Sequence, residues 1–529
     1  MKQKLDFTII AVLAIIVFNT GFNLQGFPEY FWDQGVYVDR AINFLKTSQV
    51  YQDPNYIDHP PLGWIIPSMF FGAIGFPDSI IHLSKTNNLE QQIIMLFLIP
   101  RLIGALFTIL TSILIYKISM ILYNNRNFAI TSLVIFALVP ALWSFRNLLL
   151  DPMMIMFVLL SLFVLLPKRF SNVDKNADST KISYKILFSG SLFGVALLVK
   201  LSAVFFLPAI MLFAVGYGLG LHHNKKVTVS NSYTTSEFSE QLNFKQRISR
   251  GAVWLTPVFI ALGTWVLFLN LSEHTLSHLI STQIWQAERP STLPYGIALK
   301  ILFMATPVGL VFGAIGLVQI LKNKNQRIWS VLALPYIGFL FRGGFVGFVH
   351  AIPMLPILSI FAGKPLYQLL GKRIKLLANY KKQENYFIAV LLVISIGMTI
   401  WITSFDAAKP DRDAIQFLIR DLPKNSVLIT DPGYGWAIKA FRPDVEVTDY
   451  FTLNFMHKIP TEAYIAESSS PTTMDSTLTQ SQYIYEKSCL VKTFENEPFN
   501  KYFHPYSITS DKRWNVQVRY FNMKGCTMS

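Results

Sequence analysis

Long apolar segments constrain the fold of this chain more than any other feature of its sequence. Hydrophobic residues make up 52% of the 529 residues and charged residues only 15%, whereas a soluble domain has about 25% charged residues. A helix that crosses a hydrocarbon core of about 30 Å needs roughly 20 apolar residues. Because only helices and closed barrels satisfy their backbone hydrogen bonds in lipid, we predict a polytopic α-helical membrane protein.

About eleven segments have the length and composition of membrane-spanning helices. The first follows Lys2 and Lys4, and no small-residue cleavage site comes after it, so we expect an uncleaved span. The segments cover roughly residues 7–24, 92–122, 127–146, 150–167, 185–200, 201–221, 251–271, 298–321, 328–341, 345–370 and 386–405.

A twelfth segment, 62–76, is shorter and follows Pro60 and Pro61. If it crossed the membrane, the basic loops 168–185 and 225–250 would face outward, although Lys and Arg favour the cytoplasmic side. If it lies in the interface, every basic loop between spans faces inward. We therefore predict a surface or re-entrant helix at 62–76, a cytoplasmic N-terminus and an exported C-terminus.

The net charge of +15 does not indicate a nucleic-acid partner, because of where the charge lies. Residues 406–529 hold 15 acidic and 14 basic residues, a net charge of −1. The remaining +16 belongs to short loops between apolar segments, and no basic stripe with interleaved aromatic residues is present. The charge pattern therefore predicts membrane orientation and contact with membrane lipids.

Three outer regions follow from this topology: a long first loop at about 25–91, a medium loop at about 272–297, and the region from residue 406 onward. In the first outer loop, residues 34–46 place Val36, Ala41, Phe44 and Leu45 near one face, as in an amphipathic interfacial helix. Residues 406–529 predict a small α/β domain, separate from a transmembrane domain at 1–405. Its predicted elements are a helix at 411–422 and strands at 426–430 and near 445–450.

Both cysteines of the chain, Cys489 and Cys526, lie in the predicted exported domain. Outside the cell a disulfide between them is favoured by the redox conditions. Two buried free thiols are the alternative.

Two acidic residues stand at the outer ends of predicted spans. Asp33 lies in YFWDQGVY after the first span, and Asp151 lies in FRNLLLDPMM at the start of the fourth segment. Each has the position of a helix N-cap, and Asp151 precedes a proline suited to the first helical position. A helix N-terminus also keeps a carboxylate ionised, as a general base requires.

Basic residues near the outer surface are candidates for binding a lipid phosphate. His59 precedes the paired prolines, and Arg101 stands at the outer start of the second span. Both residues have an alternative role as helix anchors among lipid headgroups. The sequence contains no nucleotide-binding loop, HExxH or CxxC.

The order of several motifs resembles a known family. After the first span come WDQGVY, HPPLG, PRLIGAL, FRNLLLDP and FSGSLFGVALLVKLSAVFFLPA. Over about residues 7–405 this order resembles the GT-C glycosyltransferases, in particular those related to protein O-mannosyltransferases and the lipid A aminoarabinose transferase. The resemblance implies an enzyme that transfers a sugar from a polyprenyl-phosphate (dolichyl-phosphate) carrier to a protein, lipid or glycan acceptor on the outer face.

The resemblance also implies roles for individual residues. Asp33 corresponds to the catalytic base, Asp151 to the second acidic residue, and His59 and Arg101 to basic residues near the donor phosphate. The family commonly has Asp-Glu where this chain has Asp33 and Gln34, so the second carboxylate is absent here. No cofactor is required, and a divalent cation shared by Asp33 and Asp151 is the open alternative.

Further candidates come from the same resemblance. Arg146 precedes Asp151 in FRNLLLDP, and His350 precedes the two prolines of HAIPMLP. Trp285, Gln286 and Arg289 lie where the family has a mobile loop over the cavity. For His350 and Trp285, the alternatives are a hydrogen-bonded polar group at a helix end and an interfacial aromatic residue.

Two other functions are weighed against this one. Residues 413–440 resemble the exported domain of oligosaccharyltransferase catalytic subunits, although ITDPGYGW stands where that family has WWDYG. A lipid or sugar transporter is disfavoured because internal repeats are absent and few acidic residues lie mid-span.

Overall fold

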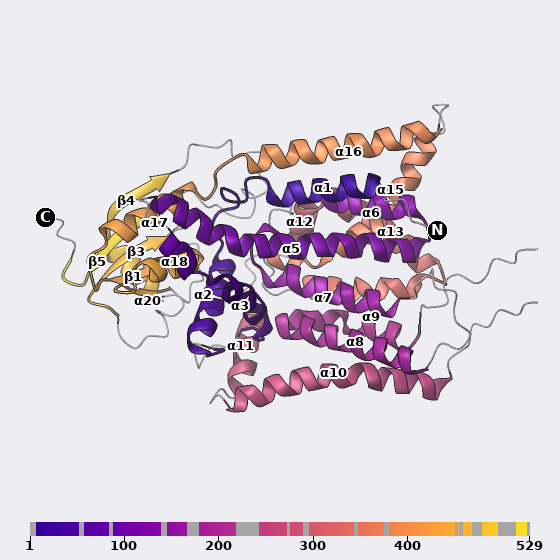
Figure 1. Cartoon of the computed structure of the whole chain (residues 1–529), viewed down its shortest axis with the longest axis horizontal. Helices are drawn as coiled ribbons and strands as arrows, with labels where there is room; N and C mark the ends of the chain where they lie inside the picture. Colours follow the sequence, from indigo (N-terminus) through magenta and orange to yellow (C-terminus); the bar gives the residue numbers. More distant parts are fainter. Residues whose placement is uncertain are drawn as a thin grey trace, which may run out of the picture.

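The computed structural model describes the chain over residues 7–51, 58–83, 88–138, 145–166, 179–217, 243–271, 276–288, 296–342, 348–374, 380–449, 453, 459–467, 479–495 and 515–525. Over these ranges the molecule is an elongated helix bundle with a small mixed sheet at one end (Figure 1). The N-terminus lies at the opposite end of the bundle from the sheet.

Helices occupy every segment that was predicted to span the membrane. The longest, α5 (Leu89–Tyr123), lies in the middle of the bundle and packs against α1, α6, α7 and α15. The other bundle helices are α1 (Phe7–Gly21), α6 (Arg126–Ala137), α7 (Leu150–Leu165), α8 (Ser179–Val199), α9 (Leu207–Ala214), α10 (Phe244–Leu271), α13 (Pro307–Lys322), α14 (Leu334–Leu340), α15 (Met354–Ile374) and α16 (Tyr380–Thr403). Short 3₁₀ turns, η2 (Leu201–Phe206), η3 (Arg327–Leu332) and η4 (Phe348–Ala351), precede α9, α14 and α15.

The segment 298–321, which was predicted as one span, is broken. It forms α12 (Gly296–Ala305) and α13, which are bent by 110° at Thr306. Pro307 has no N–H to continue the first helix, and it restricts the residue before it to extended backbone. The prediction of a straight helix here is therefore wrong.

Three described helices are long and apolar enough to cross a membrane, and a fourth is added if α12 and α13 count as one span. One of the three covers residues 62–82, so composition alone does not assign that segment to the interface. Seven shorter apolar helices accompany them. The count of about eleven spans stays a prediction.

Short outer elements lie where the bundle approaches the sheet (Figure 1). They are α2 (Trp32–Thr47), α3 (Leu62–Ile74), α4 (Asp78–Leu83) and α11 (Leu276–Glu288). The predicted amphipathic helix is confirmed as α2, but its buried face was assigned incorrectly. Tyr37, Val38 and Ala41 are buried, whereas Leu45 is 40% exposed, because α2 packs between α3 and α18 of the C-terminal region.

The C-terminal region is a five-stranded sheet in the order β2-β1-β3-β5-β4. β1 pairs in parallel with β2 and β3, and β5 runs antiparallel to β3 and β4. The predicted helix and two strands are confirmed as α17, β1 and β2. The elements are α17 (Lys409–Asp421), β1 (Val427–Thr430), α18 (Pro432–Phe441), β2 (Glu446–Thr448), β3 (Glu462–Glu467), α20 (Thr479–Lys487), β4 (Cys489–Glu495) and β5 (Asn515–Asn522). Cys489 is in a disulfide, and Cys526 lies outside the described residues.

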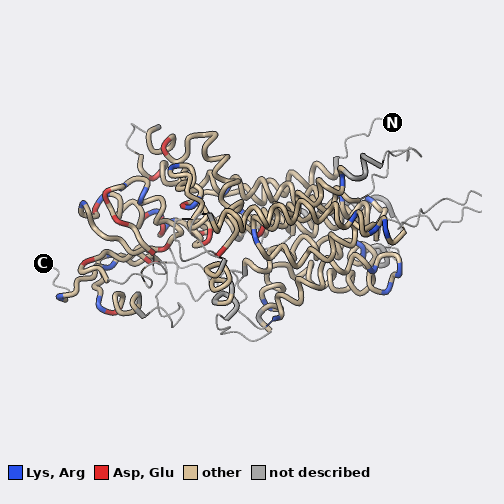
Figure 2. The backbone as a smooth tube through the Cα atoms, turned by 90° about the horizontal axis from the view of Figure 1, so that it is seen from below, with Lys and Arg blue, Asp and Glu red and all other residues tan. Residues whose placement is uncertain are grey.

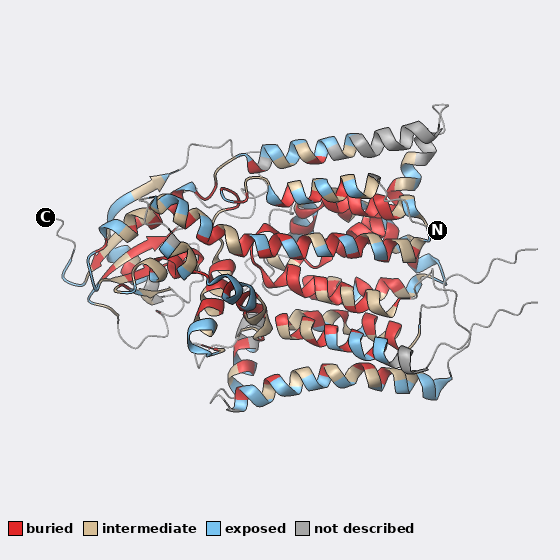
Figure 3. Ribbon diagram, viewed as in Figure 1, coloured by how far each residue is buried: buried red, intermediate tan, exposed pale blue. Residues whose placement is uncertain are grey.

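The outer faces of the bundle are apolar and exposed. Phe259 on α10 and Val393 on α16 are 65% and 67% exposed, and Figure 3 shows exposed residues along both helices. Figure 2 shows Lys and Arg gathered at the N-terminal end of the bundle, whereas Asp and Glu lie mainly toward the sheet. Apolar faces of this kind are stable only against lipid, so the chain is a membrane protein.

Cysteine labelling tests the predicted placement of 62–76. If this segment does not span, an impermeant thiol reagent applied outside intact cells should label both Gln49→Cys and Asn88→Cys, two exposed positions on either side of it. Lys324→Cys, on the predicted cytoplasmic side, should react only after permeabilisation. Labelling at 49 without labelling at 88 would make 62–82 a true span.

Candidate active site

Asp33 lies at the start of α2, close to the C-terminal region. Phe31 is the N-cap of this helix and makes no side-chain cap hydrogen bond, while Asp33 stands in the first turn and is partly buried. Capping by Asp33 is therefore not its role here. The positive end of the helix dipole still favours its ionised form.

Asp151 has the same position on α7. The N-cap is Leu149, and Asp151 stands in the first turn beside Pro152. The capping interpretation fails here too, since no side-chain cap hydrogen bond is made. Both carboxylates are thus placed by helix starts without serving as caps.

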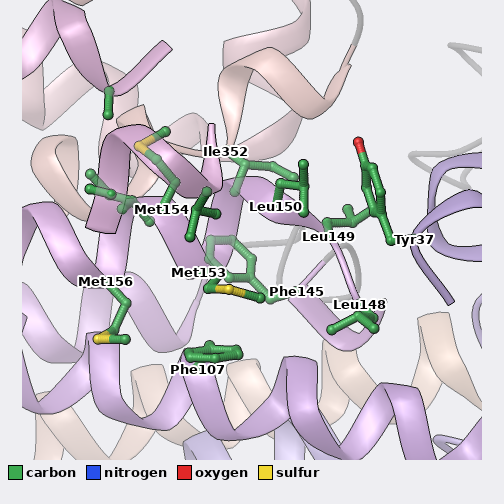
Figure 4. Packing of buried hydrophobic residues seen from close by; sticks show 14 of the residues in the cluster. Tyr37, Phe107, Phe145, Leu148, Leu149, Leu150, Met153, Met154, Met156 and Ile352 are labelled. Atoms are coloured by element: carbon green, nitrogen blue, oxygen red, sulfur yellow. The ribbon is translucent and has the colours of Figure 1, made fainter. Parts of the chain in front are cut away.

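Tyr37 is the side chain around which these carboxylates gather. It is 4% exposed, and burial raises the pKa of its phenol well above its ordinary value, with further contributions from Asp33, Asp58 and Asp151. Figure 4 shows Tyr37 beside Leu149 and Leu150 at the start of α7. Three acidic residues from separate parts of the chain therefore lie within electrostatic reach of one phenol.

Asp151 forms a buried ion pair with Lys200. The Lys200 Nζ lies 2.7 Å from the Asp151 Oδ2, and the two side chains are only 9% and 4% exposed. Lys200 stands between the end of α8 and η2, which brings it to the start of α7. Lys200 was not singled out from the sequence. It could have been found there as a cation inside an otherwise apolar run, because a charge in such a place needs a partner.

Asp58 and Arg40 form a second pair in the outer loop. The Arg40 Nη1 donates to the Asp58 Oδ1 at 2.7 Å, and the guanidinium lies over the Trp64 ring, 4.9 Å from its centroid. Burial opposes ionisation of Asp58, but Arg40 and His59 outweigh it and hold the pKa below its usual value. Asp58 is therefore a carboxylate across the neutral pH range.

His59 lies next to this pair and 6.0 Å from the Tyr37 ring, measured between ring centroids. Burial lowers the pKa of His59 to about 4, and Lys200 and Arg40 add to this effect while Asp58 opposes it. At neutral pH the imidazole is therefore uncharged, so it offers a hydrogen bond rather than a positive charge.

Arg101 is fully buried and faces the backbone. Its guanidinium donates to the carbonyls of Leu24, Pro28 and Glu29 at 2.8, 2.7 and 3.1 Å. It also lies over the Tyr30 ring, 5.3 Å from the centroid. The predicted phosphate ligand thus holds the segment between α1 and α2.

Arg146 is also fully buried, and it donates to the carbonyl of Asn19 from two guanidinium nitrogens. Its guanidinium lies 5.9 Å from the centroid of the Phe27 ring. These contacts attach the segment before α7 to the end of α1.

A third group of candidates lies at the ends of α14 and η4. The Tyr336 hydroxyl donates to the His350 carbonyl at 3.1 Å, and Tyr336 lies within electrostatic reach of Asp151. Arg342 is exposed, and its guanidinium lies 4.4 Å from the centroid of the Phe339 ring, which in turn packs against His350. Arg342 was not singled out from the sequence.

Three residues were predicted to lie in a loop over the site: Trp285, Gln286 and Arg289. Trp285 and Gln286 lie on α11, near the outer end of α10, but their side chains are not described. Arg289 lies outside the described residues. Their predicted role stays a prediction.

The described residues do not fit a cation site at Asp33 and Asp151. No group of three His, Cys, Asp or Glu side chains in the described ranges is arranged to hold a metal ion. Lys200 already neutralises Asp151 at hydrogen-bonding distance. Hard divalent cations take several oxygen ligands, and this arrangement does not supply them.

Comparisons with known proteins agree with the fold. Residues 98–234 match the family described as dolichyl-phosphate-mannose-protein mannosyltransferase, a range that includes Arg101, Asp151 and Lys200. No curated protein sequence matches the chain.

Several solved structures are similar over most of the chain. ArnT from Cupriavidus metallidurans in the apo state is similar with a TM-score of 0.59 and 12% identity, over 97% of each chain. The same protein bound to undecaprenyl phosphate gives 0.56 and 11% identity, over 98% of this chain and 99% of that chain. The oligosaccharyltransferase AglB from Archaeoglobus fulgidus, in complex with an inhibitory peptide and a dolichol-phosphate, gives 0.50 and 11% identity, over 92% and 73%.

The fold is therefore that of the GT-C membrane glycosyltransferases. The chain is similar in structure to ArnT over nearly its whole length, and residues 98–234 match the protein mannosyltransferase family. The resemblance that the sequence predicted is confirmed.

The buried ion pair gives a test of stability. Lys200→Met should destabilise the protein by about 3–5 kcal/mol, because it leaves a buried carboxylate without its partner. The double variant Asp151→Asn with Lys200→Met should recover part of that loss. Lys409→Met, which breaks the exposed pair with Asp413, should cost less than about 1 kcal/mol. Thermal unfolding in detergent measures all three, and equal effects of the two Lys→Met variants would contradict the assignment.

His59 gives a test of pH dependence. Its folded pKa of about 4 lies below the value of about 6.5 of an unperturbed histidine, so only the unfolded chain binds the proton between these values. Stability should therefore fall as pH drops from about 6.5 to about 4. His59→Gln should remove this part of the dependence, whereas a variant of the exposed His82, His82→Gln, should retain it. Unfolding temperatures at pH 7.5 and pH 5 measure the difference, and an unchanged difference in His59→Gln would refute the assignment.

Proposed function

We propose that this chain transfers a sugar from a polyprenyl-phosphate carrier to an acceptor at the outer face of the membrane, with Asp33 as general base. The observation that supports it most is the gathering of Asp33 and Asp151, each in the first turn of a helix, around Tyr37. The similarity to structures with bound undecaprenyl phosphate and dolichol-phosphate favours a donor of the same chemical class.

Asp33 is better suited to take a proton than Asp151. Asp151 is held by Lys200 in a buried pair, so it is neutralised and fixed. Asp33 is only partly buried, and the start of α2 favours its ionised form. We assign proton transfer to Asp33 and a positioning role at the start of α7 to Asp151.

The donor phosphate is assigned to basic groups on the Lys200 side of Asp151. His59 lies within electrostatic reach of Lys200, and Arg342 lies within reach of Tyr336. Arg342 is exposed and so can change partner, and the uncharged imidazole of His59 can donate one hydrogen bond to a phosphate oxygen. We place the outer border of this donor site at four further residues, His350, Trp285, Gln286 and Arg289.

The proposed reaction is a direct displacement. The acceptor oxygen attacks the anomeric carbon, the bond from that carbon to the phosphate oxygen breaks, and the lipid phosphate leaves with the electron pair. The acceptor proton goes to Asp33, while the basic groups stabilise the charge that develops on the phosphate. A phosphate-linked sugar is already activated, so no nucleotide takes part.

One observation favours an oligosaccharyltransferase-like enzyme as the second candidate. The segment DPGYGW, at the start of α18, packs directly against α2 beside Asp33. An enzyme of that kind would use a peptide acceptor and an oligosaccharide donor. Incubating the purified protein with polyprenyl-phosphate monosaccharides, and separately with lipid-linked oligosaccharide plus peptide, distinguishes the two by which donor is consumed. A transporter would consume neither.

Asp33→Asn tests the base. It removes the proton acceptor while keeping size and polarity, so transfer should fall by about 10²- to 10⁴-fold. The unfolding temperature should stay nearly constant, because Asn has the size and polarity of Asp and the N-cap of α2 is Phe31, which is unchanged. Asp78→Asn, which changes an exposed carboxylate in the first turn of α4, should keep transfer near wild type. An active and stable Asp33→Asn variant would refute the assignment.

A further inference from the structure

The segment between α1 and α2 (residues 22–31, the α1–α2 linker) leads directly to Asp33. From the bundle side it is held by Arg101, whose guanidinium donates to three linker carbonyls. Arg101 is 0% exposed, so these bonds are made away from water, where leaving a carbonyl without a partner is costly. The position of the linker is therefore fixed on one side by α5.

The exported domain holds the same linker from the other side. The Asp411 Oδ2 accepts a hydrogen bond from the Tyr30 backbone N–H at 3.2 Å, and the Ala408 N–H donates to the Gly26 carbonyl at 3.0 Å. The Tyr30 ring stacks on Phe97 of α5 with 3.4 Å between centroids. The linker thus lies between a bundle helix and the start of α17, with contacts to both.

The exported domain also touches α2 directly, two residues from Asp33. A Cβ atom added at Gly35 would lie 1.8 Å from the Pro432 carbonyl oxygen and 2.6 Å from the Gly433 Cα. A Cβ added at Gly433 would lie 2.8 Å from the Tyr30 carbonyl oxygen. The starts of α2 and α18 therefore meet backbone to backbone, which no side chain larger than hydrogen allows.

Side chains fix the two helices in this arrangement. Trp436 on α18 is 3% exposed and packs against Phe97 of α5 and Phe76 after α3, at 5.0 and 6.0 Å between ring centroids. At the outer edge the Lys439 Nζ lies 3.2 Å from the Asp39 Oδ2. The contact thus has a buried aromatic centre and an ion pair at its rim.

We propose that the exported domain and Arg101 together position Asp33, so that α17, α18 and Arg101 are positioning elements of the active site. The proposal rests on the proposed function of Asp33. It makes the contact of Gly35 with Pro432 a determinant of turnover, and it assigns Arg101 to the linker carbonyls instead of to the donor phosphate. A displacement of about 1 Å at a reacting group is enough to lower a rate by about 10²-fold.

Gly35→Ala tests the contact between α2 and α18. Its methyl group cannot fit against the Pro432 carbonyl, so α2 must shift, and transfer should fall by roughly 10- to 100-fold. Binding of undecaprenyl phosphate should stay within about twofold of wild type, because no phosphate-binding group is changed. Gly263→Ala, a helical glycine of α10 with nothing within 4 Å of its added methyl group, is the matched control and should transfer normally. Equal activity of the two variants would overturn the proposal.

Variants of Asp411 and Arg101 test the hydrogen bonds that hold the α1–α2 linker. Asp411→Asn keeps an oxygen that accepts from Tyr30 and should retain most of the transfer activity, whereas Asp411→Ala should lower kcat with little change in the donor KM. Asp413→Ala, on the exposed side of the same helix, is the control. Arg101→Gln should lower transfer and leave binding of undecaprenyl phosphate unchanged. Loss of that binding in Arg101→Gln would return Arg101 to the phosphate and refute its assignment here.

A crosslinking experiment separates this proposal from the proposed function. The full chain with Asp39→Cys and Lys439→Cys is treated with a short bifunctional thiol reagent, and the yield of intramolecular crosslink is measured. A high yield with full transfer by the crosslinked protein is expected, and Gly35→Ala should lower the yield. Loss of transfer on crosslinking would refute the docked arrangement as the working one. A wild type that consumes no donor would refute the proposed function, while the crosslinking yields would still report on docking.

Discussion

The buried guanidinium of Arg101 is the point at which the helix bundle, the α1–α2 linker and the C-terminal region come together. Its three bonds to carbonyls fix the linker against α5, and Tyr30 of that linker is bonded in turn to Asp411 of α17. A cation in this place would be costly without such partners, since it is fully buried. A side chain of the bundle therefore supplies the hydrogen-bond donors that the linker carbonyls need.

The same principle explains where the acidic residues lie. Inside the apolar layer each polar group needs a partner, so charge is confined to helix starts and to pairs. Asp151 meets this requirement through Lys200, and Asp58 through Arg40. Asp33 lies at the boundary between the bundle and the C-terminal region, where a partly exposed carboxylate is tolerated.

The helical bundle and the small sheet followed from local patterns in the sequence. Apolar runs gave the bundle helices, a helical stretch gave α17, and short apolar runs after turn residues gave β1 and β2, because these patterns depend on neighbours along the chain. The break at Thr306 was not predicted, although Pro307 is visible in the sequence. A proline in the first turn of a helix does not by itself indicate that the chain bends there. The buried face of α2 was missed because it is set by α3 and α18, which are distant in the sequence.

For the site, the sequence by itself determined which carboxylates stand at helix starts, Asp33 and Asp151. It did not determine the partners of these side chains. Lys200 reaches Asp151, and Arg101 turns to the linker carbonyls, only because α8 packs on α7 and the linker crosses α5. Burial decides these pairings, since a charge removed from water takes whatever partner the packed chain brings within reach, and that choice is made by the tertiary structure alone.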